Sequence, residues 1–412
     1  MIITKGLKIR IYPTEEQKQL INQFIGSSRF VYNQTLNFRQ LSFKQGKKVK
    51  QKDINKFLND LKAKQEYDWL QDMESTSLQQ AQRDLDKAYK NFFEKRSGFP
   101  KFHSKKKSKE SYRCQNVHNK NDTIRFVEDI QTKKLFLVLP KLGLVKFKGK
   151  LRDEMSILNA TVEHTKTDKY MVSICYQTDY TPIENAGCLV GLDLGLKQFI
   201  TDSNGNEINN PRFLEKATKK LKKLQRQFSR KQYYKSENAK NSNREKARLK
   251  LAKGFEKVTN QRNDFLQKLS TQLINENQVI VIEDLNIKGM LKNHKLARSI
   301  SSASWSKFVN MLEYKANWNG NQIIKVDRFF ASSKICNHCG YKKEDLSLSD
   351  REWKCPQCGE IIYRDKNTAK NILQEGRKIL NKNTVGYTGI HALGNSTSTT
   401  KGNPIVASRI DE

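Results

Sequence analysis

The chain has 412 residues, of which 77 are Lys or Arg and 43 are Asp or Glu, so its formal net charge is +34 at pH 7. Self-repulsion on this scale needs a counter-charge, and the composition therefore favours a polyanionic partner over a merely soluble basic protein. The 36% hydrophobic content allows packed cores in two or three domains and argues against a mainly disordered chain.

The sequence also argues against a membrane protein. No apolar run approaches the roughly 20 residues that a membrane-spanning helix needs. The N-terminus lacks the apolar core and the cleavage site of a signal peptide. We therefore expect an intracellular, cytoplasmic protein with no membrane partner.

The N-terminal hundred residues begin with a strand and continue as helices. Residues 7–11 alternate between apolar and basic side chains, which indicates a half-buried strand. Thr14 followed by Gln17 is typical of a capping box that opens a helix. Helical periodicity then continues to about Gly98.

A basic run at 101–113, which includes Lys105 and Lys106, separates this helical region from a region of strands. From about Thr123 to Asp179 the side chains alternate between apolar and polar, which predicts strands. If the N-terminal strand pairs with these later strands, the two form a β-domain with a helical insertion.

The next long helical region, roughly 211–275, carries a local excess of positive charge. A polar loop at 233–242 should turn the chain within it. Residues 211–250 contain 15 Lys or Arg and 3 Asp or Glu. Such a run is often only a solvated face, but the overall charge leads us to expect a surface for nucleic-acid backbones that includes Arg226 and Arg230.

Short elements fill most of the remaining sequence. Val279–Glu283 is a continuous β-branched run, typical of a central parallel strand covered on both faces. An amphipathic helix at Ser301–Asn317, a strand at Ile323–Val326 and a helix at Asn367–Leu373 follow. From about Gly376 onward the composition indicates a flexible tail.

Three carboxylates stand where these elements end or begin. Asp193 follows an apolar strand, Glu283 ends another, and Asp365 stands at the start of the last predicted helix. An unpaired buried carboxylate costs several kcal/mol, and a metal ion removes that cost by supplying the opposite charge. Active sites in α/β sheets collect at the carboxyl ends of strands. We therefore predict that the three side chains bind catalytic Mg²⁺ or Mn²⁺.

Each carboxylate also has a simpler interpretation when it is taken alone. Asp193 could be a strand-end turn residue, Glu283 could pair with a Lys, and Asp365 could cap a helix. Asp202 and Asp284 are rival candidates for the same site. The joint pattern of strand, strand and helix in a strongly basic chain favours catalysis.

Four of the seven cysteines form two closely spaced pairs. Cys336-x-x-Cys339 and Cys355-x-x-Cys358 are separated by residues 340–354, a spacing that fits two zinc knuckles closing on one tetrahedral site. Free thiols or a redox pair are the alternative. Four thiolates leave no open ligand position, so the zinc is expected to be structural and to contribute folding energy.

Several motifs together resemble those of the TnpB family, the RNA-guided endonucleases of bacterial insertion sequences. The resemblance covers roughly residues 1–376. The motifs are Arg29-Phe30-x-Tyr32-Asn33, Phe99-Pro100-Lys101-Phe102, Gly191-Leu192-Asp193-Leu194-Gly195, Arg262-x-Asp264-Phe265-x-x-Lys268, Ile282-Glu283-Asp284-Leu285, the two cysteine pairs each followed by Gly, and Arg364-Asp365-x-Asn367-x-Ala369-x-Asn371-Ile372.

The resemblance implies a fold of α/β plus β class, similar in its nuclease half to type V CRISPR effectors. It implies a RuvC-like, RNase H-type nuclease domain with a zinc-ribbon insertion, and a split β-barrel "wedge" domain with a helical recognition insertion. The expected bounds are 1–13 and 115–182 for the wedge, 14–114 for the recognition domain, 187–328 and 361–376 for the nuclease, 329–360 for the zinc ribbon, and 377–412 for the tail. By position, Asp193, Glu283 and Asp365 correspond to the family's catalytic trio.

The resemblance further implies a guide RNA from the transposon end and a double-stranded target DNA, cut beside a short target-adjacent motif. The protein would be monomeric in the ribonucleoprotein and would work in the bacterial cytoplasm, at the nucleoid. Gln79 and Gln80 lie near where family members approach DNA, and Gln can bond adenine bidentately. Two exposed helix polar residues are the plainer interpretation of this pair.

The chain departs from the family pattern at two positions, and two other functions remain open. Tyr363 stands where many members have an acidic residue, and Thr368 where many have Ala, but neither is a predicted metal ligand. Relatives that have lost the acidic residues act as RNA-guided repressors, so the alternative function is a DNA-binding regulator of transposition without cleavage. A resolvase-type nuclease with no RNA is the third hypothesis.

Overall fold

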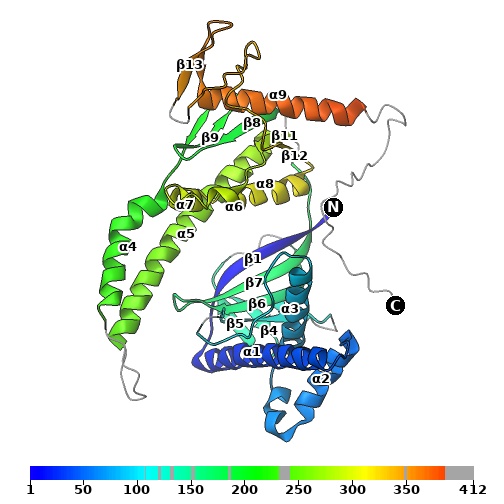
Figure 1. Cartoon of the computed structure of the whole chain (residues 1–412). Helices are drawn as coiled ribbons and strands as arrows, with labels where there is room; N and C mark the ends of the chain where they lie inside the picture. The colour runs from blue at the N-terminus through cyan, green and yellow to red at the C-terminus, as the bar shows by residue number, and fades with distance from the viewer. Residues whose placement is uncertain are drawn as a thin grey trace. The chain divides into compact units, whose positions relative to one another are not determined.

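The computed structural model describes residues 1–106, 108–118, 122–129, 134–149, 154–183, 187–231, 242–347 and 350–385 (Figure 1). Contacts within the chain divide it into two compact units, Met1–Glu184 with Arg212–Leu269, and Asn185–Pro211 with Ser270–Glu412. Each unit has its own main sheet. No helix in these described ranges is both long enough and apolar enough to cross a membrane.

The first unit contains a seven-stranded antiparallel sheet in the order β2-β6-β7-β1-β5-β4-β3. The strands are β1 (Ile2–Tyr12), β2 (Ser111–Gln115), β3 (Arg125–Glu128), β4 (Leu135–Leu139), β5 (Gly143–Phe147), β6 (Ser156–His164) and β7 (Tyr170–Asp179). The pairing predicted for the N-terminal strand is confirmed, because β1 pairs along its length with β7 and at its end with β5. β2 begins at Ser111, four residues before the expected start of the β-domain at 115.

Helices between β1 and β2 share one core with this sheet. They are α1 (Glu15–Lys44), α2 (Gln51–Ala63), the 3-10 helix η1 (Gln65–Gln71) and α3 (Ser75–Phe93). The predicted capping box is confirmed, since Thr14 and Gln17 exchange side-chain to backbone hydrogen bonds at the start of α1. Ile21 and Phe24 of α1 are fully buried in the cluster that includes Val172 of β7.

The long helical region is present as α4 (Phe213–Ser229) and α5 (Ser242–Glu276). Leu221 of α4 packs with Leu251 and Val258 of α5. The predicted loop at 233–242 lies, apart from Ser242, outside the described residues. The contacts within the chain group residues 212–269 with the first unit. The resemblance had led us to expect them in the nuclease domain, and the expected domain bounds stay a prediction.

The second unit is built on a mixed five-stranded sheet in the order β10-β9-β8-β11-β12. The strands are β8 (Leu189–Leu194), β9 (Gln198–Asp202), β10 (Glu207–Asn209), β11 (Val279–Glu283) and β12 (Gln322–Val326). β8, β11 and β12 run parallel, and β9 and β10 continue the sheet antiparallel. The prediction of β11 as a central parallel strand is confirmed. β9 and β10 were not predicted, since each is too short to give a clear pattern.

The helices of the second unit differ in part from those expected from the sequence. They are α6 (Ile287–Met290), α7 (Ala297–Ala303), α8 (Trp305–Asn319) and α9 (Arg364–Val385). The helix expected over 301–317 is interrupted at Ser304, whose φ of 58° is left-handed.

The prediction of a flexible tail from residue 377 is wrong for 377–385, because α9 continues to Val385. Ile379 and Leu380 pack against the core formed by β11 and β12, and that packing stabilises the extra turns. The tail was expected from about Gly376, but this residue lies where α9 touches the sheet: a Cβ there would stand 2.4 Å from Cγ2 of Val281. Residues 386–412 lie outside the described residues.

Candidate functional site

Asp193 and Glu283 lie side by side at the carboxyl ends of β8 and β11. The two strands are parallel, with Leu192 opposite Ile282, so the acidic residues that follow are also neighbours. Side chains two residues apart in a strand point to the same face. Asp193 therefore shares a face with Gly191, and Glu283 shares one with Val281.

Helix α9 crosses this face of the sheet. A Cβ on Gly191 would stand 2.4 Å from the carbonyl oxygen of Ala369 and 2.7 Å from the backbone nitrogen of Leu373. Asp365 lies four residues before Ala369, which puts it on the same side of α9, one turn nearer the N-terminus. The first turn of α9 thus carries Asp365 to the ends of the two strands.

Burial and the two neighbouring carboxylates both act on the pKa of Asp193. Burial raises the pKa of Asp193 to about 8, with further increases from the charges of Glu283 and Asp365. Arg364 and Arg351 act in the opposite direction on the same pKa, but more weakly. A cluster of like charges in a half-buried site calls for a cation.

Glu283 and Asp365 each have a second partner. Ser332 Oγ donates a hydrogen bond to Glu283 Oε1 at 2.5 Å, and Arg351 Nη1 lies 3.5 Å from Asp365 Oδ1. Among the described residues, the four cysteines alone form a group of His, Cys, Asp or Glu whose ligand atoms all lie within 4.8 Å of one another. The three carboxylates are therefore neighbours, but their oxygen atoms do not form one closed coordination shell. Oxygen donors that do not complete a coordination shell suit Mg²⁺, which usually keeps several waters.

The two rival carboxylates have structural partners of their own. Asp284 Oδ2 forms an ion pair with Arg328 Nη2 at 2.5 Å. Asp202 Oδ1 accepts hydrogen bonds from the backbone nitrogens of Asn204 and Asn206, which closes the turn between β9 and β10. Both residues thus hold loops in place.

Two buried asparagines connect α9 to the segment before the cysteines. Their sequence motif alone predicted no role for them. Asn367 Nδ2 donates to the carbonyl oxygen of Ile335 at 2.7 Å. Asn371 Nδ2 donates to the carbonyl oxygens of Ser332 and Ile335. Both side chains are 2% exposed, so these bonds fix the loop that carries the partner of Glu283. The sequence signal that could have indicated this role is the pair of Asn residues one helical turn apart, on either side of Ala369.

The four cysteines converge as predicted. The Sγ atoms of Cys336 and Cys358 are 3.8 Å apart, and those of Cys339 and Cys355 are 3.6 Å apart. Zinc–sulfur bonds of about 2.3 Å in a tetrahedron give sulfur separations of about 3.8 Å. The geometry of the cluster therefore fits one zinc ion.

The two halves of the cysteine cluster repeat the same backbone turn. The Gly340 nitrogen donates to the Cys336 carbonyl, and the Gly359 nitrogen to the Cys355 carbonyl, each at 2.9 Å. Both glycines have positive φ, 80° and 76°, which few other residues adopt. The hairpin of β13 (Glu352–Lys354) and β14 (Ile361–Tyr363) packs the buried Trp353 behind the cluster.

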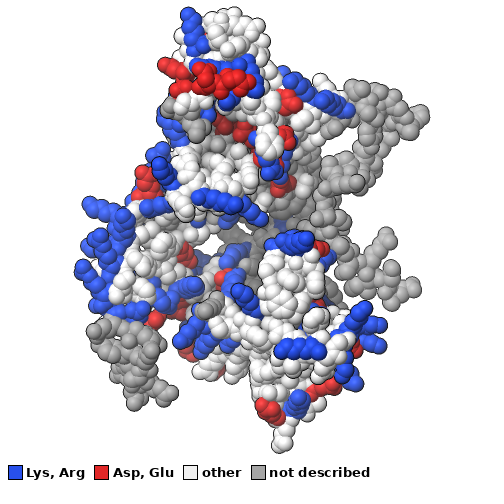
Figure 2. Space-filling view, viewed as in Figure 1, with Lys and Arg blue, Asp and Glu red and all other residues white. Residues whose placement is uncertain are grey.

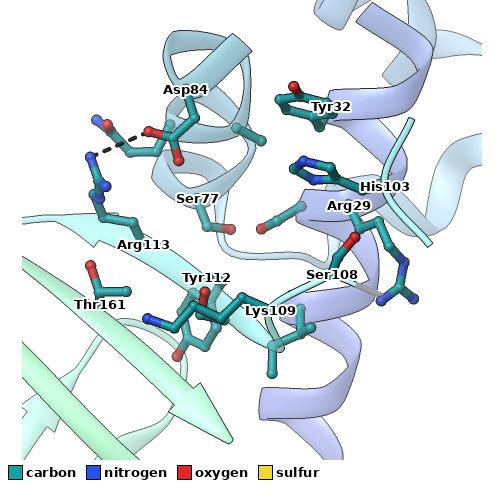
Figure 3. A pocket seen from close by; sticks show the side chains of 15 residues that line it. Arg29, Tyr32, Ser77, Asp84, His103, Ser108, Lys109, Tyr112, Arg113 and Thr161 are labelled. Carbon is teal, nitrogen blue, oxygen red and sulfur yellow. Dashed lines mark ion pairs between the residues drawn. The ribbon is translucent and has the colours of Figure 1, made fainter. Parts of the chain in front are cut away.

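The two glutamines proposed to contact DNA differ in their exposure to solvent. Gln79 is exposed, whereas Gln80 is 8% exposed and donates through Nε2 to Gln115 Oε1 at 2.5 Å. Gln80 lines a cavity of about 400 Å³ between α1, α3 and β2, whose labelled residues include Arg29 and Arg113 (Figure 3). The plainer interpretation, two exposed polar residues, is therefore wrong for Gln80.

The four basic residues predicted to contact nucleic acid are all exposed. Lys105 and Lys106 lie in the segment between α3 and β2, and Arg226 and Arg230 lie at the end of α4. Figure 2 shows Lys and Arg side chains gathered along α4. Their contact with nucleic acid stays a prediction.

Three family models match parts of the chain. A model described as "Probable transposase" matches residues 172–294, "Cas12f1-like, TNB domain" matches 305–372, and "Helix-turn-helix domain" matches 1–48. The last stretch forms one strand and one long helix in this structure.

Named relatives match over most of the chain. A "Putative RNA-guided DNA endonuclease" of Streptomyces pristinaespiralis is 37% identical over 91% of this chain and 90% of its own length. The "TnpB-like protein L79" of Acanthamoeba polyphaga mimivirus is 25% identical over 92% of this chain and 74% of its own. Among solved structures, the Cas12f1 protein in a complex with sgRNA and target DNA has a similar fold. Its TM-score is 0.58 at 13% identity, over 90% of this chain and 98% of that one.

Proposed function

This chain belongs to the TnpB family, and on that premise we propose that it is an RNA-guided DNA endonuclease. It hydrolyses phosphodiester bonds with divalent metal ions held by Asp193, Glu283 and Asp365. The observation that carries the proposal is the packing of α9 on the parallel strands β8 and β11, which brings Asp365 to the strand ends that carry Asp193 and Glu283. Burial raises the pKa of Asp193, and the charges of Glu283 and Asp365 raise it further.

The proposed architecture is that of the family. The mixed sheet with carboxylates at its parallel strand ends is assigned as a RuvC-like, RNase H-type nuclease domain. The cysteine cluster between β12 and α9 is its zinc-ribbon insertion, and the antiparallel sheet with α1 to α3 is the wedge domain with its recognition insertion. The sheet order and the position of the cysteines between two nuclease elements support this assignment.

In the proposed mechanism, the three carboxylates bind and orient the ions. When bound there, Mg²⁺ or Mn²⁺ would activate the attacking water and stabilise the leaving oxygen of the scissile phosphodiester. Ser332 donates to Glu283 and fixes one carboxylate oxygen, leaving the other free for an ion. Arg351, which lies beside Asp365, is placed to attract the phosphate as it approaches.

The proposed partners are a guide RNA from the transposon end and a double-stranded target DNA beside a short target-adjacent motif. Base pairing with the guide would read the target sequence, while the protein reads backbone shape and the short motif. The net charge of +34 and the exposed Lys and Arg of α4 suit contacts with two nucleic acids. The ribonucleoprotein would contain one copy of the chain and act in the cytoplasm, at the nucleoid.

The test begins with purification of the full chain and sequencing of any RNA that remains bound. That RNA is then used to design a plasmid target. RNA that maps beside the coding region, together with magnesium-dependent cutting that Asp193→Ala abolishes, supports the proposal. RNA-dependent binding without cutting by the wild-type protein would indicate the repressor, and cutting without any RNA would indicate a resolvase-type nuclease.

A further inference from the structure

The turn after β12 places one large apolar side chain almost entirely in solvent. Phe329 is 87% exposed, whereas the next residue, Phe330, packs against the core formed by β11 and β12. Burial stabilises a side chain in proportion to the apolar area removed from water. The ring of Phe329 therefore contributes little to the folded state and is available to contact a partner.

The backbone of this turn is fixed on both sides of the ring. The Phe330 nitrogen donates to the Asp327 carbonyl at 3.0 Å, and the Phe329 nitrogen donates to Asp327 Oδ1 at 2.8 Å. Arg328 is ion-paired with Asp284, the residue after Glu283. Phe329 is thus presented at the tip of a closed β-turn, whose geometry is set by its neighbours.

The same turn lies next to the proposed catalytic site. Glu283 pairs with Val326 at the end of β12 and accepts a hydrogen bond from Ser332. Phe329 is three residues from each of these contacts, and three residues span at most about 11 Å. The turn that carries Phe329 is therefore tied on both sides to residues that contact Glu283.

An exposed aromatic ring beside a nucleic-acid strand can stack on a base. Removing such a ring from single-strand-binding proteins weakens binding by about 5- to 150-fold for each stacked base. Inside a duplex both faces of a base are already covered by its neighbours. A ring that projects from the protein surface therefore stacks at lower cost on a base that has left the duplex, since insertion into a duplex must first unstack two base pairs.

We propose that Phe329 is a stacking platform for an unpaired base of the strand being cut, close to the scissile phosphate. This inference rests on the proposed function and adds to it a base-contacting residue beside the carboxylates. Phe329 touches the substrate but no ion, so its role is to position the strand.

Binding is measured in the Asp193→Asn protein, as purified, so that the strand is not cut. The probes are a fluorescein-labelled 15-nucleotide oligothymidylate and an abasic strand of the same length and charge. We expect the base-bearing strand to bind more tightly, and Phe329→Ala to reduce that ratio by at least 5-fold. Phe329→Trp should keep the ratio. The slope of affinity against salt should not change, because no phosphate contact is lost.

Phe43 provides a matched control, because it is 82% exposed and lies in α1 of the other unit. Phe43→Ala should leave the ratio unchanged. In the protein with Asp193 intact, Phe329→Ala should lower kcat/KM for cutting, mainly through KM, at an unchanged magnesium requirement.

The outcomes separate this inference from the proposed function. If Phe329→Ala keeps both the wild-type ratio and the wild-type kcat/KM, or if Phe43→Ala loses as much, the stacking role is wrong and the nuclease assignment stands. A protein without preference for the base-bearing strand also overturns the stacking role. If no DNA is cut by the wild-type protein while the ratio still depends on Phe329, the nuclease assignment is the part that fails.

Discussion

Gly191 of β8 and Ala369 of α9 are in direct backbone contact: a Cβ on Gly191 would stand 2.4 Å from the Ala369 carbonyl oxygen. This close approach sets the distance between α9 and the sheet. Asp193 lies two residues after Gly191, and Asp365 lies one helical turn before Ala369. The contact between these small residues therefore determines how near the two carboxylates come.

The first prediction is that Gly191→Ala separates α9 from the sheet. The added methyl group meets backbone atoms on both sides, which cannot move aside as a flexible side chain would. We expect a loss of about 1–3 kcal/mol in the free energy of unfolding and a large loss of cutting. Urea unfolding and plasmid cleavage measure the two effects.

Gly6 is the matched control for this substitution. It also lies in a strand, β1, but a Cβ there would meet nothing within 4 Å. Gly6→Ala should leave the free energy of unfolding and the cutting rate within experimental error. Equal effects of the two substitutions would show that the contact at Gly191 is not what matters.

How much the sequence could predict depends on whether a signal is local. The four cysteines, the strand ending at Glu283 and the capping box at Thr14 were all predicted correctly, because spacing within a few residues defines them. The end of α9 was not, because the composition from about Gly376 onward indicates a flexible tail until the contact of Gly376 with Val281 is known.

Within the candidate site, the carboxylates could be named from the sequence but their partners could not. Asp202 and Asp284 could be set aside only when the turn at Asn206 and the ion pair with Arg328 were visible. Both contacts depend on tertiary structure. The role of Ser332 likewise depends on a loop that Asn371 holds in place.

The second prediction concerns the stability of the protein in a chelating buffer. Burial and then Glu283 and Asp365 raise the pKa of Asp193 from 3.8 to about 8, so the folded state favours its protonated form. The stability that this proton provides is present below about pH 4 and is lost as the pH rises towards 8. Asp193→Asn cannot lose a proton, so its free energy of unfolding should fall less over this range.

Thermal unfolding in EDTA from pH 4 to 9 tests that difference. The variant should gain stability relative to the wild type as the pH rises. Adding Mg²⁺ at pH 8 should stabilise the wild type and leave the variant almost unchanged, because only the wild type can bind the ions as a carboxylate. Parallel pH curves for the two proteins would contradict the electrostatic account of the site.

The third prediction concerns zinc. Cys336→Ser removes one of four ligands, and we expect it to release zinc and unfold the surrounding segment, because bound zinc contributes its folding energy. Zinc content by elemental analysis, and fluorescence of the buried Trp353, report the change. Cys188→Ser is the control, since Cys188 is exposed and outside the cluster. A zinc content that Cys336→Ser leaves unchanged would exclude the tetrahedral site.

The fourth prediction concerns the orientation of Glu283. Ser332→Ala removes the 2.5 Å hydrogen bond to Oε1 while leaving the carboxylate in place. Groups that orient a metal ligand typically account for 10- to 100-fold in activity or metal affinity. We expect cutting to fall by about that factor, with higher magnesium partly restoring it. Ser333→Ala, one residue further on, should have no effect, and similar losses from both would argue for a general disturbance of the loop.

The most direct test of the account is magnesium-dependent cutting of a guided plasmid target by five isosteric variants. Asp193→Asn, Glu283→Gln and Asp365→Asn each remove one proposed ligand, and all three should abolish cutting while RNA and DNA binding persist. Asp202→Asn and Asp284→Asn remove equally acidic neighbours and should keep most of the wild-type rate. Wild-type cutting by any of the first three, or equal loss in all five, would contradict a site made of Asp193, Glu283 and Asp365.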